Sequence, residues 1–166
     1  MNLLHPNVRY KKMSDIPISF LKENNIKGVI LDVDNTMTTH DNMKLAPGVE
    51  DWINEARNND IKLIILSNNS PQRVRPLAEE FALEFEAKAR KPLRRGYLRA
   101  CRKMGLGPQE VAAIGDQIFT DVIGARLAGI YCIFVDYFEL EHGSFFKFKR
   151  ALERPILAGF ERKKKS

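Results

Sequence analysis

Short apolar runs rich in β-branched residues alternate with segments of helical periodicity along most of this chain. The runs are bounded by polar or turn-forming residues and predict five strands, at 27–34, 61–67, 84–88, 111–115 and 130–135. Helical patterns lie between them at 48–58, 71–81, 92–104 and 120–128, and a short helix over 14–24 precedes the first strand. Because strands that alternate with helices are typical of α/β proteins, we expect a doubly wound, Rossmann-like parallel sheet of five strands.

The first predicted strand changes abruptly from apolar to acidic at its carboxyl end. The apolar run that ends at Leu31 is followed directly by Asp32 and Asp34. In an open parallel sheet both acids would emerge in the crevice that binds ligands, and residues two apart in an extended chain point to the same side. One carboxylate could then attack a reacting group while the other gives it a proton.

Acidic pairs of this kind also occur in calcium-binding and nucleotide-binding proteins. An EF-hand loop is excluded because it needs Gly at its sixth position and Glu at its twelfth, where this chain has Met37 and Met43. An acid that binds a nucleotide ribose is excluded because no glycine-rich turn precedes Asp32. A chance pair of acids at a strand end stays open from this segment alone.

The second and third predicted strands also end in polar residues. Ser67 and Asn68 follow the second strand at the start of a helix, which suits a phosphate oxygen, although Ser and Asn also form ordinary turns. Lys91 follows the third strand and precedes a proline. Its ammonium group could neutralise a phosphoryl group, and an ordinary surface lysine is the alternative.

The fourth predicted strand is followed by two acids, Asp116 and Asp121. Asp116 is placed to join Asp32 on a hard cation such as Mg²⁺, which prefers oxygen ligands. Asp121 could instead be a helix N-terminal acid that the helix dipole favours.

The order of these segments resembles the four-motif signature of the haloacid dehalogenase superfamily of phosphatases. The motifs DxDNT, SNN after a hydrophobic strand, KP and GDQxxTD span residues 29–121. The resemblance implies that Asp32 forms an aspartyl-phosphate, and that Asp34 first protonates the leaving oxygen and then activates water. It also implies that the phosphoryl group is bound by Thr36, Ser67, Asn68 and Lys91.

The same resemblance implies a Mg²⁺ cofactor. Its ligands would be Asp32, the backbone carbonyl of Asp34 and Asp116, with Asp121 as a further acid that supports the metal or the lysine. The chemistry agrees, because an anionic nucleophile that approaches an anionic phosphate needs a cation between them.

The spacing of the motifs leaves no room for a cap domain. Only residues 37–47 separate the first motif from the next helix, so we expect a capless site that is open to a bulky or surface-presented substrate. The polar residues Thr38, Thr39, His40 and Asp41 of that loop would form the remaining lid, or are simply exposed. The basic residues Arg95, Arg99 and Arg102 share one helix face, which would attract an anionic surface or is an ordinary solvated face.

Length and charge favour one catalytic body and a distinct C-terminal segment. The 166 residues fit a single domain, which we place at 1–144, and leave an amphipathic basic tail at 145–166. The net charge is +6, and residues 147–166 carry eight Lys and Arg against two Glu, so the tail alone accounts for it. Such a tail favours binding to an anionic membrane surface, a nucleic acid or an acidic protein. A solvated terminus without a partner is the alternative.

The tail has the pattern of an interfacial helix. In a helical projection one side carries Lys147, Arg150 and Arg154, and the apolar side consists of Phe145, Phe148, Leu152, Ile156 and Phe160. Packing of the same apolar stripe on the sheet is the alternative.

Nothing in the composition indicates export, membrane insertion or redox chemistry. No apolar run approaches the ~20 residues that cross a bilayer, and the start of the chain lacks the apolar core of a signal peptide, so we expect a cytoplasmic protein. Cys101 and Cys132 lack metal-ligand spacing, and we expect both to be buried.

Within the superfamily the chain resembles the capless subfamily IIIA, and there the phosphatidylglycerophosphate phosphatases. A proline-containing leader, a helix and the segment Asn25-Ile26-Lys27-Gly28 precede the DxDNT motif, with Met37 where Leu is usual. This implies hydrolysis of phosphatidylglycerophosphate to phosphatidylglycerol at the cytosolic membrane face, with peripheral membrane association and no nucleic acid. The alternatives are a soluble phosphatase of a small phosphomonoester or a phosphoprotein, and a non-enzymatic nucleic-acid-binding module.

Overall fold

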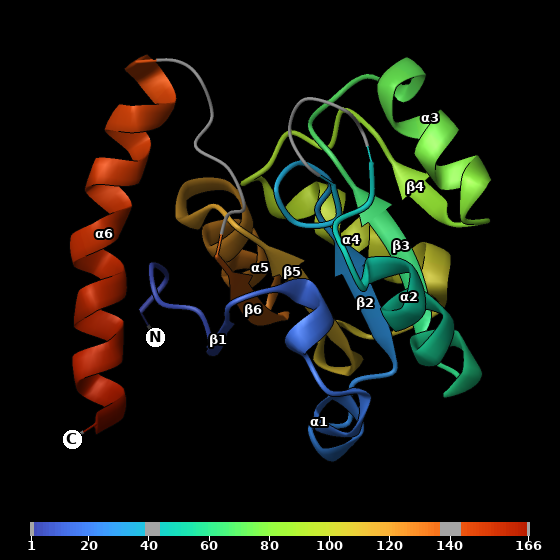
Figure 1. Cartoon of the computed structure of the whole chain (residues 1–166), viewed down its shortest axis with the longest axis horizontal. Coiled ribbons are helices and arrows are strands. Elements are labelled where there is room, and N and C mark those ends of the chain that lie inside the picture. Colours follow the sequence, from blue (N-terminus) through green and yellow to red (C-terminus); the bar gives the residue numbers. More distant parts are fainter. Residues whose placement is uncertain (1, 39–43, 137–143, 166) are drawn as a thin grey trace.

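A single parallel sheet of six strands forms the centre of the protein in a computed structural model that describes residues 2–38, 44–136 and 144–165 (Figure 1). The sheet order is β1-β6-β5-β2-β3-β4, and every pairing is parallel. The strands are β1 (Val8–Tyr10), β2 (Gly28–Leu31), β3 (Lys62–Leu66), β4 (Glu84–Glu86), β5 (Val111–Gly115) and β6 (Tyr131–Val135). The prediction of an α/β fold with a doubly wound parallel sheet is confirmed.

The prediction of five strands was wrong by one, because β1 was missed. This edge strand has only three residues, and it pairs with β6 so that Val8 lies opposite Ile133. Three residues are too few for the two-residue period of a strand to be recognised in a sequence. The strand conformation of β1 depends on its pairing with β6 more than on its own composition.

The helices cover both faces of the sheet. On one face lie α1 (Ile18–Glu23), α2 (Val49–Asn58) and α3 (Pro71–Glu80), and on the other lie α4 (Arg94–Met104), α5 (Ile123–Ala128) and α6 (Ser144–Lys165). Val29 and Leu31 pack into the first core, and Ile30 packs into the second. Burial on both faces explains why β2 is uniformly apolar.

Short turns of helix complete the chain, namely the 3₁₀ turns η1 (Met13–Asp15) and η2 (Pro108–Glu110) and the π-helical turn η3 (Ile118–Val122). The helix predicted over 120–128 is therefore divided into η3 and α5. Within η3 the carboxylate of Asp121 accepts the N–H of Gln117 at 3.1 Å. Such single π-helical turns occur frequently at functional sites.

The C-terminal helix α6 stands at the β1–β6 end of the molecule, next to the N-terminus (Figure 1). The rings of His5 and Phe160 meet there with their centroids 5.8 Å apart. Ile156 and Leu157 pack partly against the second core, whereas Phe148 and Leu152 are exposed. In the described part of the chain, no helix is long and apolar enough to cross a membrane.

The order of the strands places a topological switch point between β2 and β5. From β2 the chain adds β3 and then β4 on one side, and it later returns to add β5 and β6 on the other side. Crevices at the carboxyl ends of such adjacent strands are where open α/β sheets bind ligands. Asp32 follows β2 and Asp116 follows β5, so the sheet order brings these two acids to that crevice.

Candidate active site

Three carboxylates gather at the switch point between β2 and β5. Asp32, Asp116 and Asp121 each offer one oxygen atom, and these atoms lie within 4.8 Å of one another. Asp116 and Asp121 are buried, and Asp32 is almost so. Ionised carboxylates that lie this close together and are this deeply buried need cations beside them.

Lys91 supplies one of these cations. Its Nζ lies 2.5 Å from Oδ1 of Asp32 and 2.7 Å from Oδ1 of Asp121. Burial alone would lower the pKa of Lys91, but the two carboxylates raise it well above its ordinary value. Lys91 therefore remains an ammonium group in the site.

Asn68 holds the main chain of Lys91 in place. Its Oδ1 accepts the Lys91 N–H at 2.6 Å, and its Nδ2 donates to the Lys91 carbonyl at 3.2 Å. Both polar atoms of the Asn68 side chain are thus engaged by the protein. A direct contact between Asn68 and substrate stays a prediction.

Two buried hydroxyl groups lie at the ends of β2 and β3. Oγ1 of Thr36 donates to Oδ2 of Asp32 at 3.3 Å. Oγ of Ser67 accepts the N–H of Asn69 at 3.1 Å. The side chain of Asp32 is therefore held through one oxygen by Lys91 and through the other by Thr36.

The side chain of Asp34 is held by two residues that follow β3, namely Asn69 and Arg73 of α3. Its Oδ2 accepts a hydrogen bond from Nδ2 of Asn69 at 2.8 Å, and its Oδ1 pairs with Arg73 at 3.0 Å. Sequence reasoning missed both partners. Asn69 stands in the SNN motif and could have been found there, whereas Arg73 lies on α3 with no pattern that marks it.

Burial raises the pKa of Asp32 to about 7, although Lys91 opposes the shift. Burial also raises the pKa of Asp116 well above its ordinary value, against the opposite effect of Arg150. Protons and cations compete for such carboxylates, so a site of this kind gains from a bound cation near neutral pH.

We expect Asp32 to stabilise the metal-free protein at about pH 4 and this contribution to be lost as the pH rises to about 7. In this interval folded Asp32 keeps a proton that the unfolded chain has released, so the folded state binds more protons and a higher pH favours unfolding. Urea unfolding in EDTA across this range should show a steeper decline for the wild type than for Asp32→Asn. Equal slopes for the two proteins would contradict the assignment.

Gly115 leaves the space that Asp121 occupies. A Cβ built on Gly115 would lie 2.5 Å from Cβ of Asp121. Gly115→Ala should therefore displace Asp121 from Lys91 and cost roughly 1–3 kcal/mol of unfolding free energy, with a loss of activity, as measured by urea unfolding and phosphate release. Gly159→Ala is the matched control, because nothing lies within 4 Å of its Cβ position, and an equal response of the two variants would refute this role of Gly115.

Helix α6 reaches this site through Arg150, which sequence reasoning did not predict. Arg150 is 7% exposed, donates to the main-chain carbonyl of Asp116 at 2.6 Å and pairs with the Asp116 carboxylate. The expectation that Arg150 shares a lipid-facing side with Lys147 and Arg154 was wrong, because the acidic cluster holds the guanidinium inside the protein.

The loop expected to act as a lid is described only in part. Thr38 is buried, and its Oγ1 donates to the carbonyl of Val33 at 3.3 Å, so its side chain is not an exposed part of a lid. Thr39, His40 and Asp41 lie outside the described residues. Cys101 and Cys132 are both buried, as expected.

The fold and this arrangement of acids and lysine define a known class of hydrolases. The family model of the haloacid dehalogenase-like hydrolases matches residues 37–129. That match covers more than half of the chain, and the chain therefore belongs to this family.

Individual relatives agree with the family. "Probable phosphatase YqeG" of Bacillus subtilis (strain 168) is 37% identical over 158 residues, which cover 95% of this chain and 92% of that protein. The phosphoserine phosphatase of Thermus thermophilus is 36% identical over 101 residues, 55% of this chain and 41% of that protein. The predictions of family membership and of a phosphatase are confirmed at this level.

Solved structures share the fold. An uncharacterized protein from Listeria monocytogenes serotype 4b matches with a TM-score of 0.59 and 18% identity, over 71% of this chain and 85% of that one. The cobalt-bound deoxy-D-mannose-octulosonate 8-phosphate phosphatase of Haemophilus influenzae matches with a TM-score of 0.54 and 19% identity, over 84% and 92%. At these identities the likeness concerns the fold alone.

Proposed function

We propose that this phosphatase is Mg²⁺-dependent and works through an aspartyl-phosphate on Asp32. The observation that carries the proposal is the ammonium group of Lys91 between Asp32 and Asp121, beside Asp116, at the ligand-binding edge of the sheet. Phosphoryl transfer needs this kind of alignment and charge neutralisation more than any other catalytic device.

The donor set fits a magnesium ion. Its candidate ligands are hard carboxylate oxygens, which Mg²⁺ prefers, and Oδ1 of Asp116 is buried with no hydrogen-bond partner among the described residues. Asp32, Asp116 and the backbone carbonyl of Asp34 would bind the ion. Asp121 would lie next to the ion and keep its ion pair with Lys91. When bound, the ion withdraws charge from the phosphate oxygens and lowers the repulsion toward the nucleophile.

The side chains divide the reaction into two steps. In the first, a carboxylate oxygen of Asp32 bonds to phosphorus, the bond from phosphorus to the ester oxygen breaks, and Asp34 gives its proton to that oxygen. In the second, Asp34 takes a proton from water, the water oxygen bonds to phosphorus, and phosphate leaves Asp32. Thr36 and Ser67 would donate to the phosphoryl oxygens, and Lys91 would balance the charge on the intermediate.

For the substrate we propose a phosphate monoester at a membrane surface, phosphatidylglycerophosphate, because the sequence resembles the phosphatidylglycerophosphate phosphatases within subfamily IIIA. Leu93 is 55% exposed, two residues after Lys91, and Arg94 and Arg95 beside it are exposed. Exposed apolar and basic side chains together are typical of protein surfaces that contact anionic lipid. Further along α4 the basic face is partly neutralised, because Arg99 pairs with Glu86.

In this proposal residues 1–144 carry the catalytic residues, and the exposed side of 145–166 adds to the membrane contact while Arg150 packs on the site. Phe148, 62% exposed, and Leu152, 45% exposed, would supply apolar contact from α6, and Lys147 would supply charge. A cytoplasmic enzyme with peripheral membrane association would follow.

A soluble phosphatase is the second candidate. Two relatives that match about half of this chain are named phosphoserine phosphatase and phosphoglycolate phosphatase, and this chain spans less than half of each. Such an enzyme would use the same catalytic residues on a small ester.

Phosphate release from a panel of esters separates these candidates. The panel contains phosphatidylglycerophosphate in micelles, phosphoserine, phosphoglycolate, a sugar phosphate, a nucleotide and a phosphopeptide, each with Mg²⁺ and with EDTA. Release that needs Mg²⁺ supports the mechanism, and a preference of at least about tenfold for the lipid, together with sedimentation on phosphatidylglycerol vesicles, supports the substrate. A preference for a small soluble ester would overturn the lipid substrate and leave the mechanism intact.

A further inference from the structure

One planar guanidinium from α6 holds two oxygen atoms of Asp116. Nη1 of Arg150 donates to the main-chain carbonyl of Asp116 at 2.6 Å, and Nη2 donates to Oδ2 of its carboxylate. Both residues are buried. A rigid fork with two fixed donors sets the orientation of its partner in a way that a flexible lysine does not.

The other carboxylate oxygen of Asp116 is left for an ion. Oδ1 is buried and accepts no hydrogen bond in the described part of the chain, although Oδ2 and the main-chain oxygen are both held. Carboxylates that ligate metals are commonly held by a hydrogen bond from a further group, which keeps the ligating oxygen in place. We infer that Arg150 is a positioning residue for the metal ligand Asp116, and that α6 thereby completes the active site.

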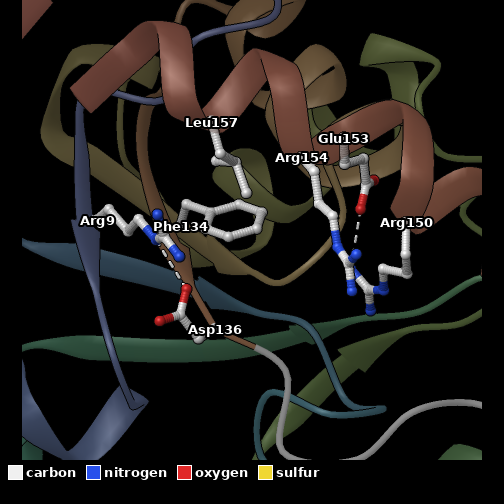
Figure 2. A pocket seen from close by; sticks show the side chains of 7 residues that line it. All are labelled: Arg9, Phe134, Asp136, Arg150, Glu153, Arg154 and Leu157. Atoms are coloured by element: carbon white, nitrogen blue, oxygen red, sulfur yellow. Dashed lines mark hydrogen bonds and ion pairs between the residues drawn. The ribbon is translucent and has the colours of Figure 1, made fainter. Parts of the chain in front are cut away.

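Glu153 fixes Arg150 in turn. Its Oε2 lies 3.0 Å from Nη1 of Arg150, and its Oε1 accepts the N–H of Ile118 at 2.8 Å. Glu153 is 3% exposed. Figure 2 shows Arg150 and Glu153 extending from α6 into the protein, and their partners Asp116 and Ile118 follow β5. One turn of α6 therefore holds Asp116 and Ile118, at the start of the segment that leads to Asp121.

Arg150, which contacts Asp116, also lines a pocket of about 400 Å³ between α6 and the strands β1 and β6 (Figure 2). The pocket is lined by Arg9, Phe134, Asp136, Arg150, Glu153, Arg154 and Leu157. Truncation of Arg150 would enlarge this pocket on the side of Asp116 and leave Oδ2 and the carbonyl of Asp116 without the donors that hold them. The carboxylate could then rotate and meet water.

Two effects of Arg150 on a bound cation oppose each other. Its positive charge repels Mg²⁺, whereas its two hydrogen bonds align the ligand. Glu153 offsets much of this charge, because its Oε2 lies 3.0 Å from Nη1 of Arg150 and it is buried as well. Alignment therefore outweighs repulsion, and removal of Arg150 weakens Mg²⁺ binding.

The test is the Mg²⁺ dissociation constant of the full-length, metal-free protein, measured by titration calorimetry without substrate. Arg150→Ala should raise this constant about 10- to 100-fold and raise the Mg²⁺ concentration for half-maximal phosphate release in parallel. Arg154→Ala is the matched control, since it removes the same charge from an exposed neighbour that makes no ion pair within the described residues, and it should keep the Mg²⁺ affinity of the wild type. Circular dichroism establishes that each variant is folded.

Two results would overturn the inference, namely a folded Arg150→Ala that binds Mg²⁺ as tightly as the wild type, or one that binds it more tightly. If Arg150→Ala does not fold, Arg150→Gln replaces it, with weaker Mg²⁺ binding expected and unchanged binding contradictory. The inference rests on the proposed magnesium site. If the wild type binds no Mg²⁺, both the magnesium site and the role of Arg150 are contradicted. If the wild type binds Mg²⁺ and Arg150→Ala binds it equally well, the role of Arg150 is contradicted and the magnesium site is retained.

Discussion

Asp32→Asn should reduce Mg²⁺-dependent phosphate release by about a thousandfold or more, as expected when a covalent nucleophile is removed. The amide has nearly the same shape as the carboxylate, and its oxygen can still accept the hydrogen bond from Thr36. It cannot attack phosphorus as an anion, and it cannot pair with Lys91. The loss should appear in the turnover number, measured by phosphate release at saturating substrate.

Asp60→Asn is the control for this substitution. Asp60 is exposed and precedes β3, at the edge of the sheet opposite to the active site, and its positive φ of 60° is one that Asn also adopts. Its activity should equal that of the wild type. If Asp32→Asn kept more than about a tenth of the activity, Asp32 would not be the nucleophile.

Lys91→Met should destabilise the metal-free protein by roughly 3–5 kcal/mol, the range for a buried ion pair that loses one partner. The variant keeps an unbranched apolar side chain in place of the stem of Lys91, but it leaves Asp32 and Asp121 facing each other without a cation between them. Added Mg²⁺ should restore part of the lost stability because it supplies positive charge to the same cluster. Activity should stay low even with Mg²⁺, since the charge on the phosphorylated intermediate is no longer balanced.

Urea unfolding with and without Mg²⁺ measures this effect. Lys103→Met provides the comparison, because Lys103 forms a partly exposed ion pair with Glu86. Its loss should lower the free energy of unfolding by no more than about 1 kcal/mol. A cost below about 1 kcal/mol for Lys91→Met would mean that Lys91 does not neutralise the buried acids.

Three of the proposed site residues, namely Asp32, Ser67 and Asp116, could be predicted from the sequence because each follows directly after a strand. A buried parallel strand has a strong apolar signal, and the first polar residue after it must lie at the carboxyl edge of the sheet. Asp32, Ser67 and Asp116 were placed in this way, without knowledge of the order of the strands. The order then determined that Asp32 and Asp116 lie side by side, which no local pattern states.

The residues that hold the catalytic groups could not be predicted, because their partners lie far away in the sequence. Arg150 meets Asp116 across 34 positions, and Arg73 meets Asp34 across 39. A helical projection of residues 145–166 puts Arg150 on a polar side. Such a projection contains only residues of the same helix, so it cannot show that Asp116 pairs with Arg150. The edge strand β1 was missed for the same reason, since its partner β6 lies at the other end of the chain.

A crystal structure of the wild type with Mg²⁺ and beryllium fluoride, a mimic of a phosphoryl group on a carboxylate, tests the central claim most directly. We predict the fluoride complex on a side-chain oxygen of Asp32, one Mg²⁺ in contact with Asp32 and Asp116, and Lys91 beside both. Beryllium fluoride on another residue, or an ion that binds away from Asp116, would contradict the account.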